Sequence, residues 1–396
     1  MKRPPLEVAD ILRQAGKDFI EKSRRWLTWQ HVRVLRAIQH CRTAALGGHK
    51  DNCSQCGYRT ISFNSCRNRH CPKCQTNARN QWLAARAAEL LPVPYFHVVF
   101  TVPQELAAIG LQNKRLFYEL LLRISAETLL EVAANPKHLG AQIGFLSVLH
   151  TWGQTLQHHP HAHCVIPAGG LSADLSRWQH TSSPRFLLPV EVLSCVFRGK
   201  FKDALKEAFH QQKINFYGHL SHLADKKQFA RFIQTLYRQK WVVYAKPPFG
   251  GPEHVLNYLA RYTHRVAISN HRLLSFDGQN VAFRWKDHAH GNKKRKMTLT
   301  ADEFLRRFLL HVLPPGFVRI RHYGFLANRR RTEAIALCRK LIGEAVPTND
   351  RISKESAPQS NWSCPKCSGP MMVIERLSAP QILRALTNER YVLDSS

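Results

Sequence analysis

Apolar positions at helical spacing dominate the first part of the chain. Residues 5–41 read as helical, and Thr28 is well placed to cap a helix in LTWQHVRVLRAIQHC. A cysteine-rich stretch interrupts this pattern, and a further helical pattern runs on to about Leu90. Pro92 and Pro94 are expected to end that helix, because proline cannot continue one.

Strand-like runs begin at Tyr95. The first is YFHVVFTV, and the segment KRLFYELLLRISAETLLEVAA after it has the length and period of a helix. Two more strand candidates follow, over residues 143–152 and 161–168. Because Gly, Gln, His and Pro lie between them, they predict an antiparallel hairpin. The expected order is strand, helix, strand, strand.

The rest of the chain mixes helical, strand and basic stretches. Residues 170–235 are mostly helical and read as an insertion, and WVVYAK after them reads as a strand. A helix is predicted in GPEHVLNYLARYTHR, and a β-hairpin in RLLSFDGQNVAFRW, with Asp277 and Gly278 at its turn. The basic run HGNKKRKM is expected to be a loop that leads to a strand and to a helix from Asp302. Residues 346–362 are polar and read as a linker.

The charge of the chain is far from balanced. Its 396 residues include 58 Lys and Arg against 27 Asp and Glu, which gives a formal net charge of +31. Such an excess repels itself unless a polyanion neutralises it, and nucleic acid is the usual polyanion. The sequence has no apolar run of transmembrane length, and its N-terminus lacks the apolar core of a secretion signal. These features predict a cytoplasmic protein with no membrane partner.

Cysteine is used in a way that favours metal binding. Five of the eleven cysteines lie between Cys53 and Cys74, and thiols in the cytoplasm are metal ligands more often than disulfides. Two CxxC pairs, Cys53 with Cys56 and Cys71 with Cys74, are predicted to hold one structural Zn²⁺ in a zinc ribbon. The alternative is a set of free thiols that cluster by chance.

Further candidate ligands lie beside these pairs. Cys66, His70 and His49 either form an additional zinc site or support the first one. The C-terminal CPKC, with Cys364 and Cys367, is half a site, and the sequence is equally compatible with a metal there and with none.

Basic residues accompany the cysteines. Arg67, Arg69 and Lys73 lie within the stretch that the two CxxC pairs enclose. A basic knob held together by zinc suits contact with DNA phosphates better than it suits catalysis.

A histidine-rich strand is the second candidate site. His161 and His163 alternate with Ala162, so both project from the same face of the predicted strand. The hairpin could bring His150 beside them, which would give a divalent ion three nitrogens and leave open positions for phosphate and water.

The alternative is that these histidines have a structural role and bind no metal. The chain has 22 histidines, and buried ones often only hydrogen-bond their neighbours. His158 and His159 are expected at the turn, exposed to solvent.

Two tyrosines form the third candidate site. Tyr258 and Tyr262 are four residues apart, on one face of a predicted helix, among Arg261, His264 and Arg265. Tyrosine can attack a phosphodiester as a nucleophile, and nearby cations favour the phenolate. An aromatic packing pair is the commoner explanation of such spacing when it stands alone.

These residues together match a known family. A strand with HAH followed by a helix with YLARY resembles the HUH (His-hydrophobic-His) single-strand endonucleases in their two-tyrosine form. Four longer segments look like the rolling-circle insertion-sequence transposases of the IS91 type. They are GGHKDNCSQCGYRTISFNSCRNRHCPKCQ, HTWGQTLQHHPHAHCVIPAGG, YLARYTHRVAISNHRL and RHYGFLAN, and the similarity covers residues 5 to about 345.

The resemblance implies an α+β fold and roles for the site residues. The fold would be an HUH-type antiparallel sheet with helices packed on it, preceded by a helical and zinc-ribbon-like N-terminal domain. His161 and His163 would hold Mg²⁺ or Mn²⁺. His150 is our choice for the third ligand, and Gln154 and His254 are the alternatives. Tyr258 and Tyr262 would be nucleophiles that keep the 5′ end of a nicked strand.

Four consecutive segments are expected. Residues 1–90 would form the N-terminal helical and zinc-binding domain, and 91–300 the catalytic domain, with its insertion at about 170–235. Residues 301–345 would form a basic helical DNA-binding segment, and 346–396 a linker and the CPKC tail. Further DNA contacts are expected from these residues: Lys293, Lys294, Arg295, Arg329, Arg330 and Arg331.

The expected partners are single-stranded DNA at transposon ends and target DNA, and the chain is a candidate homodimer. Two other functions stay open. One is a plasmid relaxase or replication-initiator nuclease with the same site, and the other is a non-catalytic zinc protein that binds DNA. The histidine strand and the paired tyrosines favour an enzyme, because a protein that only binds DNA has no need of them.

Overall fold

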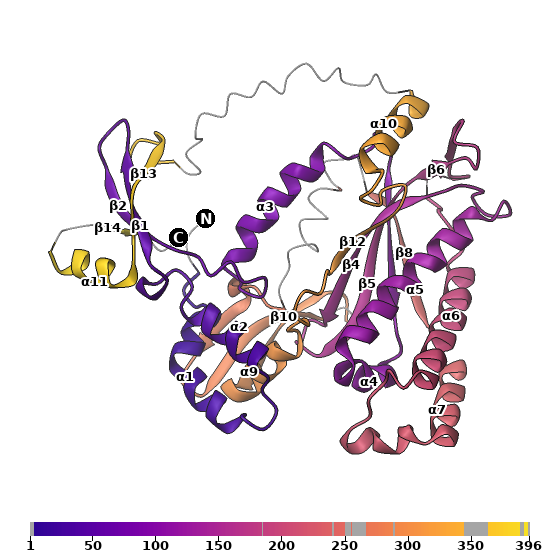
Figure 1. Ribbon diagram of the computed structural model, residues 1–396, viewed down its shortest axis with the longest axis horizontal. Coiled ribbons are helices and arrows are strands. Elements are labelled where there is room, and N and C mark those ends of the chain that lie inside the picture. Colours follow the sequence, from indigo (N-terminus) through magenta and orange to yellow (C-terminus); the bar gives the residue numbers. More distant parts are fainter. Residues whose placement is uncertain are drawn as a thin grey trace. The chain divides into compact units, whose positions relative to one another are not determined.

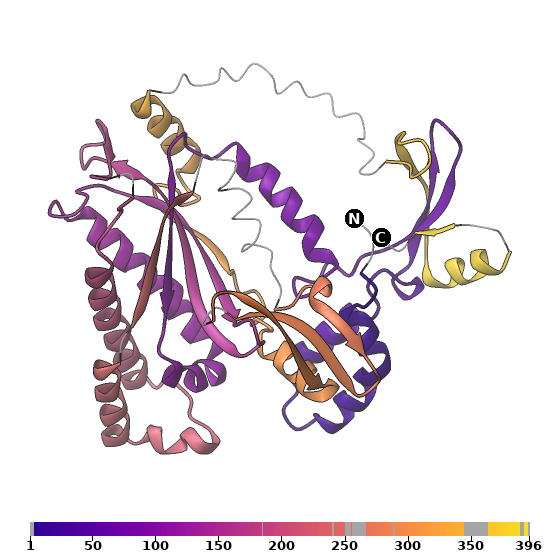
Figure 2. The ribbon, with the colours of Figure 1, turned by 180° about the vertical axis from the view of Figure 1, so that it is seen from behind.

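A computed structural model shows the chain as two compact units (Figures 1 and 2). The structure describes residues 4–183, 185–239, 241–249, 255, 267–287, 290–343, 363–388 and 392–394. The first unit comprises Met1–Asn77, Ile268–Val312 and Thr348–Ser396, and the second comprises Ala78–Ala267 and Leu313–Pro347. Both units are discontinuous in sequence, unlike the four consecutive segments expected.

A five-stranded antiparallel sheet forms the centre of the second unit. Its strand order is β12-β4-β5-β3-β8, and every neighbouring pair is antiparallel. The predicted hairpin is β4 and β5. The strands are β3 (Tyr95–Thr101), β4 (Gly144–Trp152), β5 (His158–Pro167), β8 (Val242–Phe249) and β12 (Ile320–Gly324).

Helices cover one face of this sheet (Figure 1). Phe96 and Phe100 of β3 and Ile166 of β5 point into a core that they share with Leu121 and Phe197. Among the described residues, the α-helices that lie wholly within this unit are α4 (Ala107–Gln112), α5 (Lys114–Ala134), α6 (Val190–His210), α7 (Lys226–Arg238) and α10 (Arg331–Ile342). A two-stranded sheet of β6 (Gly169–Leu171) and β7 (Trp178–His180) lies in the insertion.

The opposite face of the sheet is divided along its strands. One part is apolar, where Leu146, Val148 and Val165 form a core with Ile335 and Cys338 of α10. The histidines project from the same face, beyond this apolar part, because they follow Leu146 and Val148 and precede Val165 at intervals of two residues. The site therefore lies on the face that α5 and α6 do not cover.

The first unit contains a helical and strand core. Helices α1 (Val8–Lys22) and α2 (Trp29–Gln39) confirm the predicted N-terminal helices, and the Thr28 hydroxyl accepts from the backbone N–H of His31 at 3.3 Å, as an N-cap does. A three-stranded antiparallel sheet has the order β11-β10-β9. Its elements are β9 (Leu273–Phe276), β10 (Asn280–Asp287) and β11 (Lys293–Thr300), followed by α9 (Ala301–Leu310).

A second sheet of the first unit joins both ends of the chain. Its order is β13-β1-β2-β14, so strands from the C-terminal segment flank the N-terminal β1–β2 hairpin (yellow and purple in Figure 1). The elements are β1 (Gly48–Cys53), β2 (Arg59–Phe63), β13 (Met371–Leu377), α11 (Ala379–Asn388) and β14 (Val392–Asp394). Helix α3 (Cys74–Ala87) begins in this unit and continues into the other.

Short 3₁₀ helices complete the described elements. They are η1 (Ala44–Leu46), η2 (Gln104–Leu106), η3 (Gly218–Ala224) and η4 (Asn270–Arg272). None of the helices in the described part of the chain is long and apolar enough to cross a membrane.

The structure confirms the α+β class and corrects two elements. Most of the basic run expected to be a loop belongs to the strand β11, because Lys293 to Met297 pair with Asp287 to Phe283 of β10. The segment expected to be helical, residues 301–345, also supplies the edge strand β12 of the five-stranded sheet. The predicted helix with the two tyrosines lies outside the described residues.

Candidate metal centres

Three histidines from neighbouring strands form the first candidate site. His150 lies in β4, directly opposite His161 of β5, and His163 follows on the same face of β5. One ring nitrogen from each of the three lies within 4.8 Å of the other two. The ring centroids of His150 and His163 are 4.4 Å apart, and those of His161 and His163 are 4.7 Å apart. The structure thus brings together the three histidines that the hairpin pattern singled out.

The hydrogen bond of His161 determines which of its nitrogens can bind a metal. Its Nδ1 lies 2.7 Å from the carbonyl oxygen of His159. A carbonyl oxygen can only accept, so Nδ1 carries the hydrogen and Nε2 keeps the lone pair. Burial lowers the pKa of His161 to about 4, so the ring is neutral at pH 7. A neutral imidazole with a fixed tautomer is ready to bind a divalent cation.

A fourth histidine supports the cluster from the neighbouring strand β3. The Nε2 of His97 lies 2.8 Å from the Nδ1 of His163, and both residues are buried. Because this bond occupies Nδ1 of His163, Nε2 is the nitrogen left to face a metal ion. Burial and then the charge of Lys246, its cross-strand partner, lower the pKa of His97 to about 3. His97 was not predicted, and its only signal in the sequence is a histidine inside the apolar run YFHVVFTV.

Removing this support is expected to weaken metal binding. A hydrogen bond to the second ring nitrogen of a ligating histidine orients the ring, and its loss typically lowers metal affinity about 10–100-fold. We therefore expect His97→Ala to raise the dissociation constant for Mn²⁺ by about that factor in a calorimetric titration. His322→Ala is the matched control, because His322 lies on edge strand β12 and outside the cluster. An unchanged Mn²⁺ affinity in His97→Ala would contradict the supporting role.

The donor set determines which ions fit. Three imidazoles leave positions on an ion open for a phosphate oxygen and water. Among the residues that the structure describes, no carboxylate joins the three histidines. Mg²⁺ prefers oxygen ligands, whereas Mn²⁺ accepts imidazole more readily. Of the two ions expected from the sequence, Mn²⁺ therefore fits this site better.

The expectation for His158 was wrong. Instead of lying exposed at the turn, His158 is buried, and its Nε2 lies 2.8 Å from the hydroxyl of Tyr118 on α5. The cause is the strand alternation, since β5 already begins at His158 and turns it toward the helices while His161 and His163 face the other way. Burial lowers the pKa of His158 to about 4.

The structure describes one of the two alternative third ligands. Gln154 is described, but it lies in the turn between β4 and β5, outside both strands. His254 lies outside the described residues.

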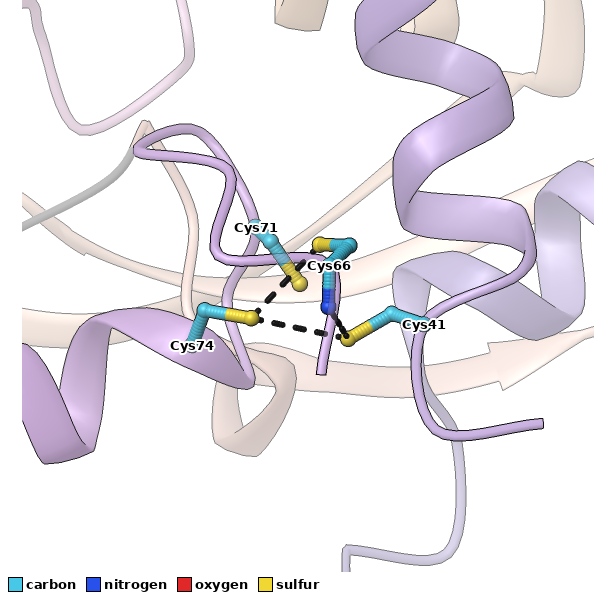
Figure 3. Close-up of side chains that lie close together, drawn as sticks. All are labelled: Cys41, Cys66, Cys71 and Cys74. Carbon is cyan, nitrogen blue, oxygen red and sulfur yellow. Dashed lines mark hydrogen bonds between the residues drawn. The ribbon is translucent and has the colours of Figure 1, made fainter. Parts of the chain in front are cut away.

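Four cysteines form the second candidate site (Figure 3). Cys41 follows α2, Cys66 and Cys71 lie in the loop after β2, and Cys74 begins α3. Their four sulfur atoms lie within 4.8 Å of one another, and Cys74 is 3.5 Å from both Cys41 and Cys66. A tetrahedral Zn²⁺ with Zn–S bonds of about 2.3 Å has S···S edges of about 3.8 Å, so the cluster has nearly the size that zinc requires.

The prediction that Cys53, Cys56, Cys71 and Cys74 share one ion is therefore wrong. Cys53 and Cys56 lie instead with Cys364 and Cys367 in a third cluster. Spacing along the chain could not show this, because each CxxC pair is a local turn, whereas the choice of partner pair depends on the fold. Cys41 was missed because it is a single cysteine at the end of a helix.

The surplus histidines do not join either cysteine cluster. His70 is buried, and its backbone N–H donates to the side-chain oxygen of Asn68 at 2.9 Å. His49 lies in β1, with Nε2 3.5 Å from a carboxylate oxygen of Asp51. Cys66 is the one surplus residue that lies in a cluster.

The expected DNA-contacting residues of the first unit fall into different environments. Arg67 is exposed and Arg69 is half-buried. Lys73 forms a 2.7 Å ion pair with Glu7, in which both side chains are at least nine-tenths buried. Its charge is neutralised within the protein, so Lys73 is not placed to contact a phosphate.

The basic side chains of strand β11 are more accessible to solvent than Lys73. Lys293, Lys294 and Arg295 are all exposed, and Arg295 pairs with the buried Asp287 at 2.9 Å.

The arginines after β12 lie in the second unit. Arg329 and Arg330 line a pocket of about 550 Å³. Arg331 is half-buried and forms a 3.3 Å ion pair with Glu89. Tyr258, Tyr262, Arg261 and Arg265 lie outside the described residues.

Family models and known proteins match the sequence of this chain. A family model described as "Transposase zinc-binding domain" matches residues 11–102, and one described as "Putative transposase" matches residues 144–333. The "Putative transposase y4qJ" of Sinorhizobium fredii is 53% identical over 386 residues, which cover 95% of this chain and 96% of that protein. The "Transposase for insertion sequence element IS801" of Pseudomonas savastanoi pv. phaseolicola is 30% identical over 301 residues, which cover 75% and 70%.

These similarities extend over both units and nearly the whole length of the first relative. Together with the sheet and the cysteine-rich domain, they place the chain among the transposases. The chain belongs to the IS91-type family of insertion-sequence transposases, which confirms the resemblance seen in the sequence.

Proposed function

We propose that this transposase nicks and rejoins single-stranded DNA at transposon ends through a 5′-phosphotyrosine intermediate. The observation that carries the proposal is the cluster of His150, His161 and His163 on a rigid antiparallel sheet. A metal site of three histidines is expected of a nuclease and has no evident use in a protein that only binds DNA. The paired Tyr258 and Tyr262 of the sequence supply the nucleophiles.

The histidines would hold the catalytic ion. Their three nitrogens suit Mn²⁺ or Mg²⁺, which would polarise the phosphate that is attacked. The ring of His163 is oriented by His97, and that of His161 by the carbonyl oxygen of His159. Lys246, opposite His97 on β8, adds a positive charge on this face of the sheet, where it would stabilise the phosphate oxygens.

The proposed first step exchanges one phosphate ester for another. The phenolic oxygen of Tyr258 or Tyr262 attacks phosphorus, a tyrosine O–P bond forms, and the P–O3′ bond breaks. The phenol loses its proton to solvent and the departing 3′ oxygen gains one, so a free 3′-hydroxyl and a 5′-phosphotyrosine result. Attack by a 3′-hydroxyl reverses the exchange and joins the strands. Because the ester energy is retained, no external energy source is needed.

Two tyrosines would let one chain handle two ends. Residues four apart share a helix face, so each could reach the same metal site in turn. While one holds the first 5′ end, the second could attack at the target or at the other end. The sequence does not determine which tyrosine attacks first.

The remaining functional residues would bind DNA and maintain the fold. The exposed cations of β11 and Arg67 would contact phosphates, and so would Arg329 and Arg330, which line a pocket. Cys41, Cys66, Cys71 and Cys74 would hold a structural Zn²⁺. The site of action would be the cytoplasm, where chromosomal DNA is accessible.

The deciding experiment is a cleavage assay on single-stranded oligonucleotides that carry the transposon end. With Mn²⁺, we expect the protein to become attached to the 3′-labelled fragment, which bears the new 5′ end, and to release the 5′-labelled fragment. The adduct should survive denaturation and be absent in EDTA. The double variant Tyr258→Phe/Tyr262→Phe should bind DNA and form no adduct, whereas Tyr217→Phe, at an exposed tyrosine, should form it normally.

Other outcomes would favour the alternatives. DNA binding with no adduct in any divalent metal would indicate a non-catalytic zinc protein. An adduct without joining of two transposon ends on a donor plasmid would indicate a relaxase or replication-initiator nuclease. An adduct in the double tyrosine variant would contradict the proposed nucleophiles.

A further inference from the structure

The cysteines left out of the first zinc cluster form a cluster of their own. Cys53 ends β1, and Cys364 and Cys367 precede β13, so 314 positions separate Cys53 from Cys367. The sulfur atoms of these three residues and of Cys56 lie within 4.8 Å of one another. Cys53 is 3.5 Å from Cys367, and Cys56 is 3.6 Å from Cys364. This cluster therefore has the dimensions of a tetrahedral four-thiolate zinc site.

Both cysteine pairs are folded into the same turn. Four residues after Cys53, the N–H of Gly57 donates back to the Cys53 carbonyl oxygen at 3.1 Å. Four residues after Cys364, the N–H of Ser368 donates back in the same way at 2.9 Å. Gly57 and Ser368 both adopt left-handed backbone angles, with φ of 67° and 60°, although serine rarely does so. Two distant segments thus form equivalent knuckles that face each other.

A backbone N–H group points at one of the four sulfur atoms. The N–H of Lys366 donates to the sulfur of Cys364 at 3.4 Å. Bonds from N–H to sulfur stabilise the deprotonated form, which is the form that binds zinc.

We propose that Cys53, Cys56, Cys364 and Cys367 bind a second structural Zn²⁺, which fastens the C-terminal segment to the N-terminal domain. Two of these ligands lie far beyond residues 11–102, the part that the zinc-binding family model matches. The site is independent of the cleavage chemistry.

The sheet around the cluster explains what the second ion would do. Strand β13 pairs with β1 from Gly48 to Cys53, and an ion pair of 3.2 Å joins Lys50 to Glu375 across them. Beyond β13, Ile382 of α11 is fully buried against Ile61 of β2. A two-stranded hairpin such as β1–β2 is marginal by itself. The C-terminal segment is therefore an integral part of the zinc-binding domain, and the second ion would hold it in register.

Zinc content tests the proposal directly. The full chain would be prepared with His161→Ala and His163→Ala, so that imidazoles cannot add a zinc, and its metal content would be measured by mass spectrometry. We expect two zinc ions per chain, one after adding Cys364→Ser/Cys367→Ser, and two after adding Cys195→Ser. Cys195 is the matched control, because it is an exposed cysteine outside both clusters. One zinc in the parent chain, or no loss in the Cys364/Cys367 variant, would overturn the proposal.

Alkylation gives a second test that needs no cysteine variant and so cannot fail through misfolding. Cys367 and Cys195 are both exposed. In the zinc-loaded native chain, we expect Cys195 to be labelled first and Cys367 only after a strong chelator is added. Labelling of Cys367 as fast as Cys195 would overturn the proposal. So would labelling that requires a reductant instead of a chelator, because that result indicates a disulfide.

Discussion

Replacing His161 by alanine is expected to lower metal-dependent cleavage of a single-stranded transposon end by about 10³-fold or more. His161 supplies one of three nitrogens that converge within 4.8 Å, and alanine supplies none. The remaining two imidazoles would hold the ion weakly and in the wrong orientation for a phosphate. Since the ion contributes several kcal/mol to the stabilisation of the developing charge, its loss should appear in the cleavage rate. The measurement is single-turnover cleavage at a fixed Mn²⁺ concentration.

The control separates this effect from damage to the fold. His159→Ala removes an imidazole two residues away in β5 but retains the carbonyl oxygen that accepts from His161, so cleavage should change little. DNA affinity should be the same in both variants, because phosphate binding is expected from β11 and the arginines. Normal cleavage by His161→Ala would rule out the metal cluster as the catalytic site. Equal losses in both variants would point to a general disturbance of β5.

Strand alternation explains why so much of the histidine site could be predicted. The two-residue period places His161 and His163 on one face from the sequence alone, and the turn residues between two apolar runs predict the hairpin that adds His150. His97 could not be predicted in this way. It reaches His163 only because β3 inserts beside β5, and the order of strands in a sheet is a property of the whole fold.

The cysteines show the same division between local and long-range information. CxxC spacing correctly indicates that two thiols can turn toward one point, but it does not say which pairs meet. Cys41 lies 33 positions before Cys74, and Cys364 lies 308 positions after Cys56. Both contacts depend on the packing of helices and the pairing of β13 with β1. The hydrophobic period and the spacing of the cysteines do not predict such contacts.

A run of charged residues can also form a strand that the hydrophobic pattern does not predict. The run KKRKM has no apolar alternation, so it was expected to be a loop, yet Lys293 to Met297 form most of β11. Its backbone pairs with β10, and its basic side chains remain exposed, because β11 is an edge strand and needs no apolar partner. Backbone pairing with β10 therefore determines the structure of this segment, and its own side-chain pattern does not predict it.

Cys41→Ser is expected to remove zinc from the first cluster and to destabilise the first unit by several kcal/mol. Structural Zn²⁺ binds zinc-finger peptides with about 10–16 kcal/mol of apparent free energy, which is also folding free energy, and serine is a poor replacement for a thiolate ligand. Cys41 is fully buried after α2, and the N–H of Cys66 donates to its sulfur at 3.5 Å. The loss should appear as a lower thermal unfolding midpoint and one zinc fewer per chain.

His70→Ala is the decisive comparison, because His70 is buried next to Cys71 and would be the ligand if the ion were held by three cysteines and one histidine. The geometry instead leaves His70 outside the four sulfurs, so His70→Ala should retain its zinc and most of its stability. If His70→Ala lost the zinc while Cys41→Ser kept it, the cluster in Figure 3 would be the wrong ligand set. Loss in Cys41→Ser alone would establish that a residue between α2 and β1 closes the site, and that the helical and cysteine-rich parts fold as one domain.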